Sequence, residues 1–316
     1  MLLGSILISE LCAILLNPIM MNIKLYTLLQ LLNQTETDDL TGRLNDFKKF
    51  TSTLIDFTDN LHTAQIKTEY WKQYLEIQLV KFSFHSSTLA YLIDGTPISV
   101  PNSNKTTKYP DIGSIYLIGR ALIENYLMFY YLNIQPQTFD EGEFRYLLYE
   151  LGGLNQRQGY KLSIRVNDPK IIKEKKDIDI IISKIKLNKF FLSLPKQKQN
   201  QLLADKPAKM IGWEKLIETS HLDTDFFLTT WKLYSNYSHS EMIGSIQIKE
   251  YVTKPTELNT TLNTALTFAN MLTCIAIIDL VKLFKSSEIV YNTLPVELTT
   301  KIEYYWKAGT GQIKKK

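Results

Sequence analysis

Residues Ile115–Leu132 read IYLIGRALIENYLMFYYL, the most apolar segment of the chain, and they carry two charged side chains, Arg120 and Glu124. A helix that is apolar nearly all round is normally buried at the centre of a fold. A charge buried there is costly unless it is paired and hydrogen-bonded. Residues four apart face the same way on a helix, so we expect Arg120 and Glu124 to contact each other. The segment therefore predicts a central helix that holds a polar centre.

The rest of the chain has an ordinary globular composition with a strong helical pattern. Of its 316 residues, 45% are hydrophobic and 22% are charged, and only 13 are glycine and 10 proline. Segments with helical period dominate, so we predict an all-α helical bundle. These segments are Ile23–Leu32, Asp38–Leu61, Thr68–Leu92, Asp111–Leu132, Asp140–Ser163, Lys170–Leu192, Lys196–Ala204, Trp213–Thr219, Asp225–Ser238, Glu257–Phe284 and Pro295–Trp306.

Three local patterns refine this prediction. Gly95–Pro110 is rich in turn formers and predicts a loop. Asp140, with Glu143 three residues later, predicts a helix start of the capping-box type. Ile178–Leu187 alternates as a strand would, but the length of the surrounding pattern favours a helix.

We expect three parts along the chain. They are an N-terminal helical segment at residues 1–64, a helical domain at 65–285 with a basic helical insertion at about 157–209, and a C-terminal helix with a basic tail at 286–316. Met20 and Met21 offer alternative starts, which leaves open whether residues 1–20 belong to the native chain.

Neither long apolar run predicts a membrane span. Leu2–Leu16 is interrupted by Glu10 and is shorter than the roughly 20 apolar residues that a span needs. Ala265–Leu283 contains Asn270 and Asp279, which favour a buried helix. We therefore expect no membrane association and a cytoplasmic protein.

Metal and cofactor chemistry has little support in the sequence. The two cysteines, Cys12 and Cys274, are far apart in apolar runs, which is typical of buried free thiols. The four histidines are scattered and show no metal-ligand spacing. Phosphate-binding glycine loops are also missing, so we expect neither a metal nor a cofactor.

A second polar segment, Trp231–Glu241 (WKLYSNYSHSE), is the best candidate partner for Arg120 and Glu124. On one helix, Trp231, Ser235 and His239 fall at i, i+4 and i+8 on a single stripe. Histidine titrates near neutral pH and can act as a general acid or base. The alternative is a histidine hydrogen-bonded between helices, with Arg120 and Glu124 as its anchors.

Positive charge is concentrated in one stretch. Between Arg157 and Lys209 there are 14 Lys and Arg residues but only 5 Asp and Glu residues, a net charge of +9, whereas the whole chain carries +4. Such a stretch can bind a phosphate backbone through counterion release, which makes RNA a candidate partner. The alternative is a solvated, lysine-rich helix face.

The two polar segments together resemble a known family. An apolar helix with R-x-x-x-E (Arg120, Glu124), followed by Y-S-x-Y-S-H (Tyr234 to His239), is similar to all-α bacterial domains of the HEPN superfamily. The resemblance covers about Thr68–Phe284 and rests on short motifs. It implies a helical bundle, often a homodimer, in bacterial defence or toxin–antitoxin settings.

Active HEPN proteins are metal-independent ribonucleases in which an Arg and a His, four to six residues apart on one helix, help the RNA 2′-OH attack the adjacent phosphate. The histidine matches His239 here. The arginine has no match: four intervening residues give Tyr234 and six give Lys232. Lysine is not equivalent to arginine at a bidentate phosphate site.

Two functional hypotheses follow. In the first, the chain is a HEPN-like endoribonuclease with His239, Arg120 and Glu124 as catalytic residues. The substrate would be positioned by four residues of the second segment, namely Lys232, Ser235, Asn236 and Ser238. In the second, it is a non-catalytic helical interaction or sensor module that binds a protein partner, and Arg120, Glu124 and His239 form a structural network.

Overall fold

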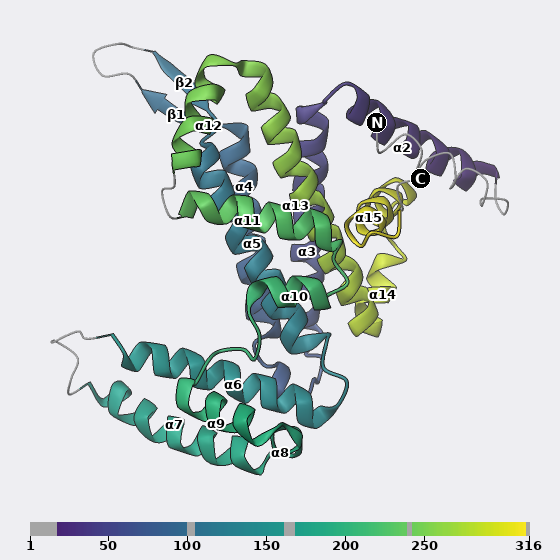
Figure 1. Ribbon diagram of the computed structural model, residues 1–316. Coiled ribbons are helices and arrows are strands. Elements are labelled where there is room, and N and C mark those ends of the chain that lie inside the picture. Colours follow the sequence, from purple (N-terminus) through teal and green to yellow (C-terminus); the bar gives the residue numbers. More distant parts are fainter. Residues whose placement is uncertain (1–17, 100–104, 161–167, 239–241, 314–316) are drawn as a thin grey trace. The chain divides into compact units, whose positions relative to one another are not determined.

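The computed structural model describes residues 18–99, 105–160, 168–238 and 242–313 (Figure 1). The described part of the chain is 80% helical, with 14 α-helices and one small two-stranded sheet. The predicted all-α class is confirmed.

The chain forms two compact units, each built from separate segments. Unit 1 comprises Met1–Ile66, Glu76–Tyr126 and His221–Lys316, and unit 2 comprises Lys67–Leu75 and Leu127–Ser220. The division into three parts along the chain stays a prediction.

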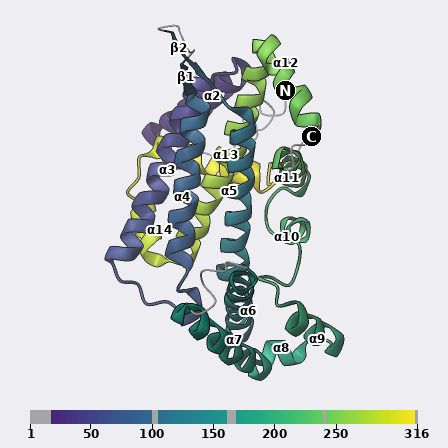
Figure 2. The same cartoon turned by 90° about the vertical axis from the view of Figure 1, so that its left-hand side faces the viewer.

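The long helix Pro255–Leu283 lies at the centre of unit 1 and is covered by its neighbours. Its elements are α2 (Pro18–Glu36), α3 (Leu40–Thr63), α4 (Leu75–Asp94), β1 (Thr96–Ser99), β2 (Thr106–Tyr109), most of α5 (Ile112–Asn133), α11 (Thr224–Ser238), α12 (Met242–Thr253), α13 (Pro255–Leu283), α14 (Lys285–Tyr291) and α15 (Val296–Gly309). Helix α13 packs against α3 and α15, and α15 also packs against α2 (Figures 1 and 2).

The α13 segment Thr256–Leu283 is the one described helix that is long and apolar enough to cross a membrane. In its most apolar window, 78% of the residues are buried inside the fold, as in the core helix of a soluble protein. A charged pair lies in the same core, where Lys301 Nζ is 2.9 Å from Asp46 Oδ1 and both side chains are at most 7% exposed. The prediction of a buried helix is confirmed for this segment.

Unit 2 is a smaller set of helices around its own core. Its elements are η1 (Tyr70–Lys72), the end of α5, α6 (Phe139–Gln158), α7 (Pro169–Leu187), α8 (Lys189–Ser193), α9 (Lys196–Asp205) and α10 (Trp213–Thr219). Apolar residues of α6 and α7, such as Phe144, Leu148 and Ile185, form this core with Trp71 of η1. The ambiguous stretch Ile178–Leu187 belongs to α7, so the preference for a helix there is confirmed.

The structure corrects two of the local predictions. The predicted loop at Gly95–Pro110 contains an antiparallel hairpin, in which Thr96 pairs with Tyr109. Helix α6 starts at Phe139, and its cap is Thr138, whose side chain accepts a hydrogen bond from the Glu141 backbone N–H. Thr138 and Glu141 have the same three-residue spacing as Asp140 and Glu143, so spacing alone did not identify the first residue of the motif.

Candidate functional site

Arg120 and Glu124 form the expected ion pair on α5. Arg120 Nε donates a hydrogen bond of 2.9 Å to Glu124 Oε1. Each side chain is 23% exposed, and Leu117, one turn earlier on the same face, is 43% exposed. The predicted contact is confirmed, but it lies at the edge of unit 1, because this side of α5 reaches the surface.

Trp231 on α11 completes this centre. Its Nε1–H donates to Glu124 Oε1 at 3.1 Å, and the Arg120 guanidinium carbon lies 5.7 Å from the centre of the Trp231 ring. One carboxylate oxygen therefore accepts from both partners, and the indole also meets the cation. The second polar segment therefore supplies the partner for Arg120 and Glu124, and this partner is Trp231, for which the sequence predicted no role. The position of Trp231 on one stripe with Ser235 and His239 was the sequence feature that could have identified it.

The other predicted site residues have different surroundings. Ser235 Oγ donates to the carbonyl oxygen four residues earlier at 2.7 Å, a bond within α11. Lys232 is exposed and Asn236 is half-buried. Ser238 ends α11, but its side chain lies outside the described part of the structure, as does the whole of His239.

Tyr234, at the position where the HEPN pattern has an arginine, is a core residue of unit 1. It is 2% exposed, stacks on Tyr116 with ring centroids 4.6 Å apart, and meets Phe268 edge-on at 5.2 Å. A Cβ on Gly119 would come within 2.5 Å of this ring, so only glycine permits such a close approach. Burial also raises the pKa of Tyr234. Its side chain is therefore a neutral packing group.

A further polar trio in unit 1 was not predicted. Tyr126 Oη donates to Asp279 Oδ2 at 2.7 Å, and His221 Nε2 lies 2.8 Å from the same hydroxyl and 3.3 Å from Asp279 Oδ2. Asp279 is 3% exposed, whereas the His221 side chain is 33% exposed. A lone Asp in the apolar helix α13 was the available signal, because such a carboxylate must find donors.

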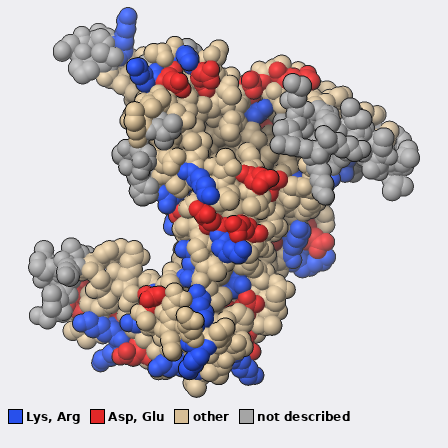
Figure 3. All heavy atoms as spheres, in the orientation of Figure 1, with Lys and Arg blue, Asp and Glu red and all other residues tan. Residues whose placement is uncertain are grey.

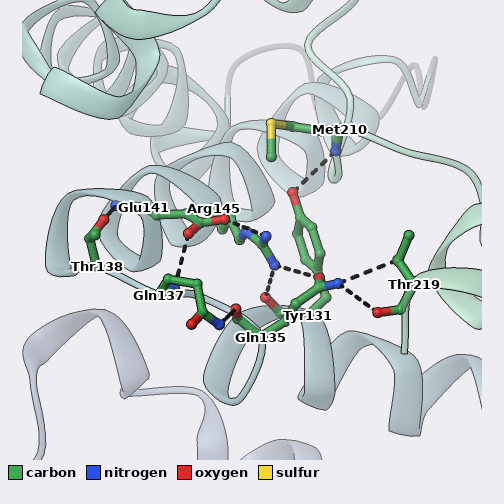
Figure 4. Close-up of polar contacts among 8 residues, drawn as sticks. All are labelled: Tyr131, Gln135, Gln137, Thr138, Glu141, Arg145, Met210 and Thr219. Atoms are coloured by element: carbon green, nitrogen blue, oxygen red, sulfur yellow. Dashed lines mark hydrogen bonds and ion pairs between the residues drawn. The ribbon is translucent and has the colours of Figure 1, made fainter. Parts of the chain in front are cut away.

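Unit 2 holds a second, deeper arginine centre (Figure 4). Arg145 on α6 donates to the Tyr131 carbonyl oxygen at 2.8 Å, to Gln135 Oε1 at 2.7 Å and to Glu141 Oε1 at 2.5 Å. The Arg145 and Glu141 side chains are 8% and 12% exposed. The guanidinium carbon also lies 4.4 Å from the centre of the Tyr131 ring. This arginine links α6 to the end of α5 and to the turn that follows it.

The groups around Arg145 have partners of their own. Glu141 Oε2 accepts from the Gln137 backbone N–H at 2.9 Å, and Tyr131 Oη accepts from the Met210 backbone N–H at 3.2 Å. Burial raises the pKa of Tyr131 to about 12, although the charge of Arg145 opposes this shift. Such a network is typical of a structural role, since both terminal nitrogens of Arg145 have acceptors, although its Nε has none, and the tyrosine stays neutral at physiological pH.

Several lysines of α7 in unit 2 are exposed, and Figure 3 shows Lys and Arg, with some Asp and Glu among them, over this unit. The exposed members, here called the α7 lysines, are Lys170, Lys173, Lys175, Lys176, Lys184 and Lys186. Glu174, in the middle of this helix, is buried, and both of its carboxylate oxygens face the Arg157 guanidinium. This carboxylate is therefore directed away from the lysines. The helix also carries Asp177, which is half-buried, and Asp179, which is exposed, so the six lysines still give a net positive surface.

No protein-family model matches the chain, and no curated protein or solved structure matches it. Among the residues that the structure describes, no three His, Cys, Asp or Glu side chains are grouped as a metal site. The candidate functions therefore depend on the geometry of the two arginine centres and of the α7 lysines.

Proposed function

We propose that the chain is a cytoplasmic RNA-binding helical protein, and that the α7 lysines are its RNA-contacting surface. The observation that carries this proposal is the exposure of six lysines on one helix of 19 residues. Nucleic-acid affinity depends mainly on cations that replace the counterions of the phosphates.

The placement of charge on α7 supports this surface. Lys173, Lys176 and Lys184 recur with helical spacing on one side of the helix, beside the face that buries Ile181 and Ile185, and Asp177 is the one acidic residue among them. The exposed Ile180 lies among them at 54% exposure. Lysines around an aliphatic residue can bind phosphates and also cover the sugar of a flexible single strand.

Anisotropy titrations of a fluorescent single-stranded RNA at several salt concentrations test the proposal. Replacing Lys173, Lys176 and Lys184 with glutamine should lower the salt slope by about 2 and weaken binding about 100-fold at 0.1 M salt. A matched control replaces three exposed lysines of unit 1, Lys48, Lys49 and Lys81, and keeps the same net charge. Equal losses in both variants would contradict the proposal.

The Arg120, Glu124 and Trp231 centre fits the non-catalytic interpretation better than a ribonuclease site. Glu124 accepts from both partners, and Tyr234 fills the motif position with a neutral ring. We therefore propose that this centre holds α11 on α5, and that the protein binds its RNA without cleaving it.

One observation favours the endoribonuclease as a second candidate. The Arg120 side chain keeps 23% of its surface exposed, and α11 leads directly into His239. In that case His239 is the general acid and base, Arg120 and Lys232 stabilise the developing charge, and Ser235, Asn236 and Ser238 position the strand. A defence or toxin–antitoxin role and a homodimer belong to this candidate.

Incubating labelled RNA with purified protein in a chelator distinguishes the two candidates. The binding proposal expects intact RNA with both wild type and His239→Ala. Cleavage by the wild type that His239→Ala abolishes would establish the ribonuclease instead.

A further inference from the structure

Five aromatic rings line up where η1 packs on α6 in unit 2. We call them the aromatic patch, and in order of contact they are Phe139, Tyr70, Tyr146, Tyr74 and Tyr149. Successive ring centroids are between 5.9 and 6.4 Å apart. Phe139, Tyr70 and Tyr74 are 52%, 48% and 36% exposed, whereas Tyr146 between the two tyrosines is buried, so three of the five rings face solvent.

Trp71 is the buried residue of η1 that packs on α6. Trp71 is 6% exposed, and it lies so close to α6 that a Cβ on Gly142 would come within 2.6 Å of its ring. Tyr146, the middle ring of the patch, is only 4% exposed and contacts the rings of both Tyr70 and Tyr74. Tyr70 and Tyr74 flank this anchor and stay 48% and 36% exposed although both contact rings of α6, and a group of exposed aromatic rings is typical of a binding surface.

Two carboxylates lie at the edge of the row. Glu143 accepts a hydrogen bond from the Tyr70 hydroxyl, and Glu150 Oε1 accepts from the Tyr74 hydroxyl at 3.2 Å. Burial, aided by the bond to Glu143, raises the pKa of Tyr70, so its ring stays neutral and the negative charge resides on the carboxylates. Aromatic faces next to carboxylates are the surroundings that bind cations.

We propose that the aromatic patch binds a lysine- or arginine-rich segment of a protein partner. The α6 residues from Phe139 to Tyr149 span about 15 Å at the rise of an α-helix. That length matches about four to five residues of extended chain. A row of rings therefore fits a peptide with successive cationic side chains better than a single amine or lipid headgroup.

The patch differs in chemistry from the α7 lysines in the same unit, and the lysine within η1, Lys72, is paired with Glu69 at 3.0 Å. Polyanions are attracted by the lysines, whereas the patch offers carboxylates and the negative faces of rings. The proposal does not depend on RNA binding, because different residues carry the two surfaces.

Fluorescence anisotropy with the full chain and a labelled ten-residue peptide of alternating lysine and serine tests the proposal. Tyr70→Ala and Phe139→Ala should each weaken binding about threefold to fivefold, and the double variant about tenfold or more. Tyr70→Phe, which keeps the ring, should stay within about twofold of wild type. Tyr91→Ala is the matched control, since this tyrosine of α4 in unit 1 is 58% exposed.

Two further arms complete the test. A peptide with acetylated lysines should bind at least about tenfold more weakly, because acetylation removes the positive charge. Both alanine positions are on the surface, so unchanged far-UV circular dichroism should accompany the losses. The proposal is overturned if the wild type fails to bind the basic peptide at about 1 mM, the range of weak specific contacts. Equal binding of the acetylated peptide, or an equal loss in Tyr91→Ala, overturns it as well.

Discussion

Two arginine–glutamate pairs, each four residues apart on one helix and each beside an aromatic ring, are buried to different depths in the two units. On α5, Arg120 and Glu124 are each 23% exposed, and the guanidinium lies 5.7 Å from the Trp231 ring. On α6, Arg145 and Glu141 are 8% and 12% exposed, and the guanidinium lies 4.4 Å from the Tyr131 ring.

The order of the charges and the added partners explain the difference. Glu before Arg is the favourable order on a helix, and it occurs only in the α6 pair. Arg145 also donates hydrogen bonds to the Tyr131 carbonyl and to the Gln135 side chain. Its guanidinium therefore binds the end of α5 and the turn after it as well as the Glu141 carboxylate. A deeply buried arginine is tolerated when it completes several hydrogen bonds at once. We therefore expect the α6 pair to support the fold more strongly than the α5 pair.

The largest expected effect is that of Arg145→Ala. It leaves the Glu141 carboxylate buried without its cation and removes the donor to the Tyr131 carbonyl, so the free energy of unfolding should fall by about 3–5 kcal/mol. Urea denaturation measures this loss. In a double-mutant cycle, adding Glu141→Ala to Arg145→Ala should cost less than it does in the wild type. A loss below about 1 kcal/mol would show that Arg145 is not a supporting element.

The matched change on α5, Arg120→Ala, should cost only about 1–2 kcal/mol. Glu124 keeps the Trp231 N–H as a donor, and water reaches both side chains, so no carboxylate is left uncompensated in the core. The same urea measurement applies. If Arg120→Ala destabilised the protein as much as Arg145→Ala, the contrast between the two centres would be lost.

The helices could be predicted because burial in this fold follows helical period. The apolar pattern of residues 111–132 predicts a helix, and α5 occupies Ile112–Asn133. The hairpin at Thr96–Ser99 and Thr106–Tyr109 was missed, because its short strands are mostly exposed and leave no apolar alternation to detect.

The candidate site was predictable only in part, since charges attract notice only where their neighbours are apolar. Arg120 stood out in an apolar helix with one acidic residue, whereas Arg145 lies in a segment with three glutamates, Glu141, Glu143 and Glu150, any of which could pair with it at the surface. Its burial comes from tertiary packing against Tyr131 and the turn after α5. The spacing places Trp231 on the polar stripe of its helix. However, a pattern within one helix cannot indicate which of its side chains contacts a carboxylate on a different helix.

A smaller change tests how the α5 centre is held. Trp231→Phe keeps an aromatic ring beside Arg120 and removes the N–H donor to Glu124, so it should cost about 1 kcal/mol, the usual worth of one hydrogen bond. Adding Arg120→Ala to this variant should cost more than in the wild type, because Glu124 then loses its second donor. Additive losses would indicate that the two donors act independently.

The smallest expected effect separates the two centres by pH, because tyrosine titrates and tryptophan does not. The pKa of Tyr131 is raised to about 12 in the folded chain, above its ordinary value near 10. The contribution of neutral Tyr131 to the free energy of unfolding is therefore fully present below pH 10. It is lost as the pH rises toward 12, because this tyrosine ionises at lower pH in the unfolded chain than in the folded one.

Tyr131→Phe removes this titration. Its stability relative to wild type should therefore improve by about 0.8 kcal/mol between pH 8 and pH 10.5, as measured by urea midpoints. Trp231→Phe on α5 is the matched control, and its difference from wild type should stay constant over the same range. A constant difference for Tyr131→Phe would mean that the ring beside Arg145 is more accessible to water than its burial indicates.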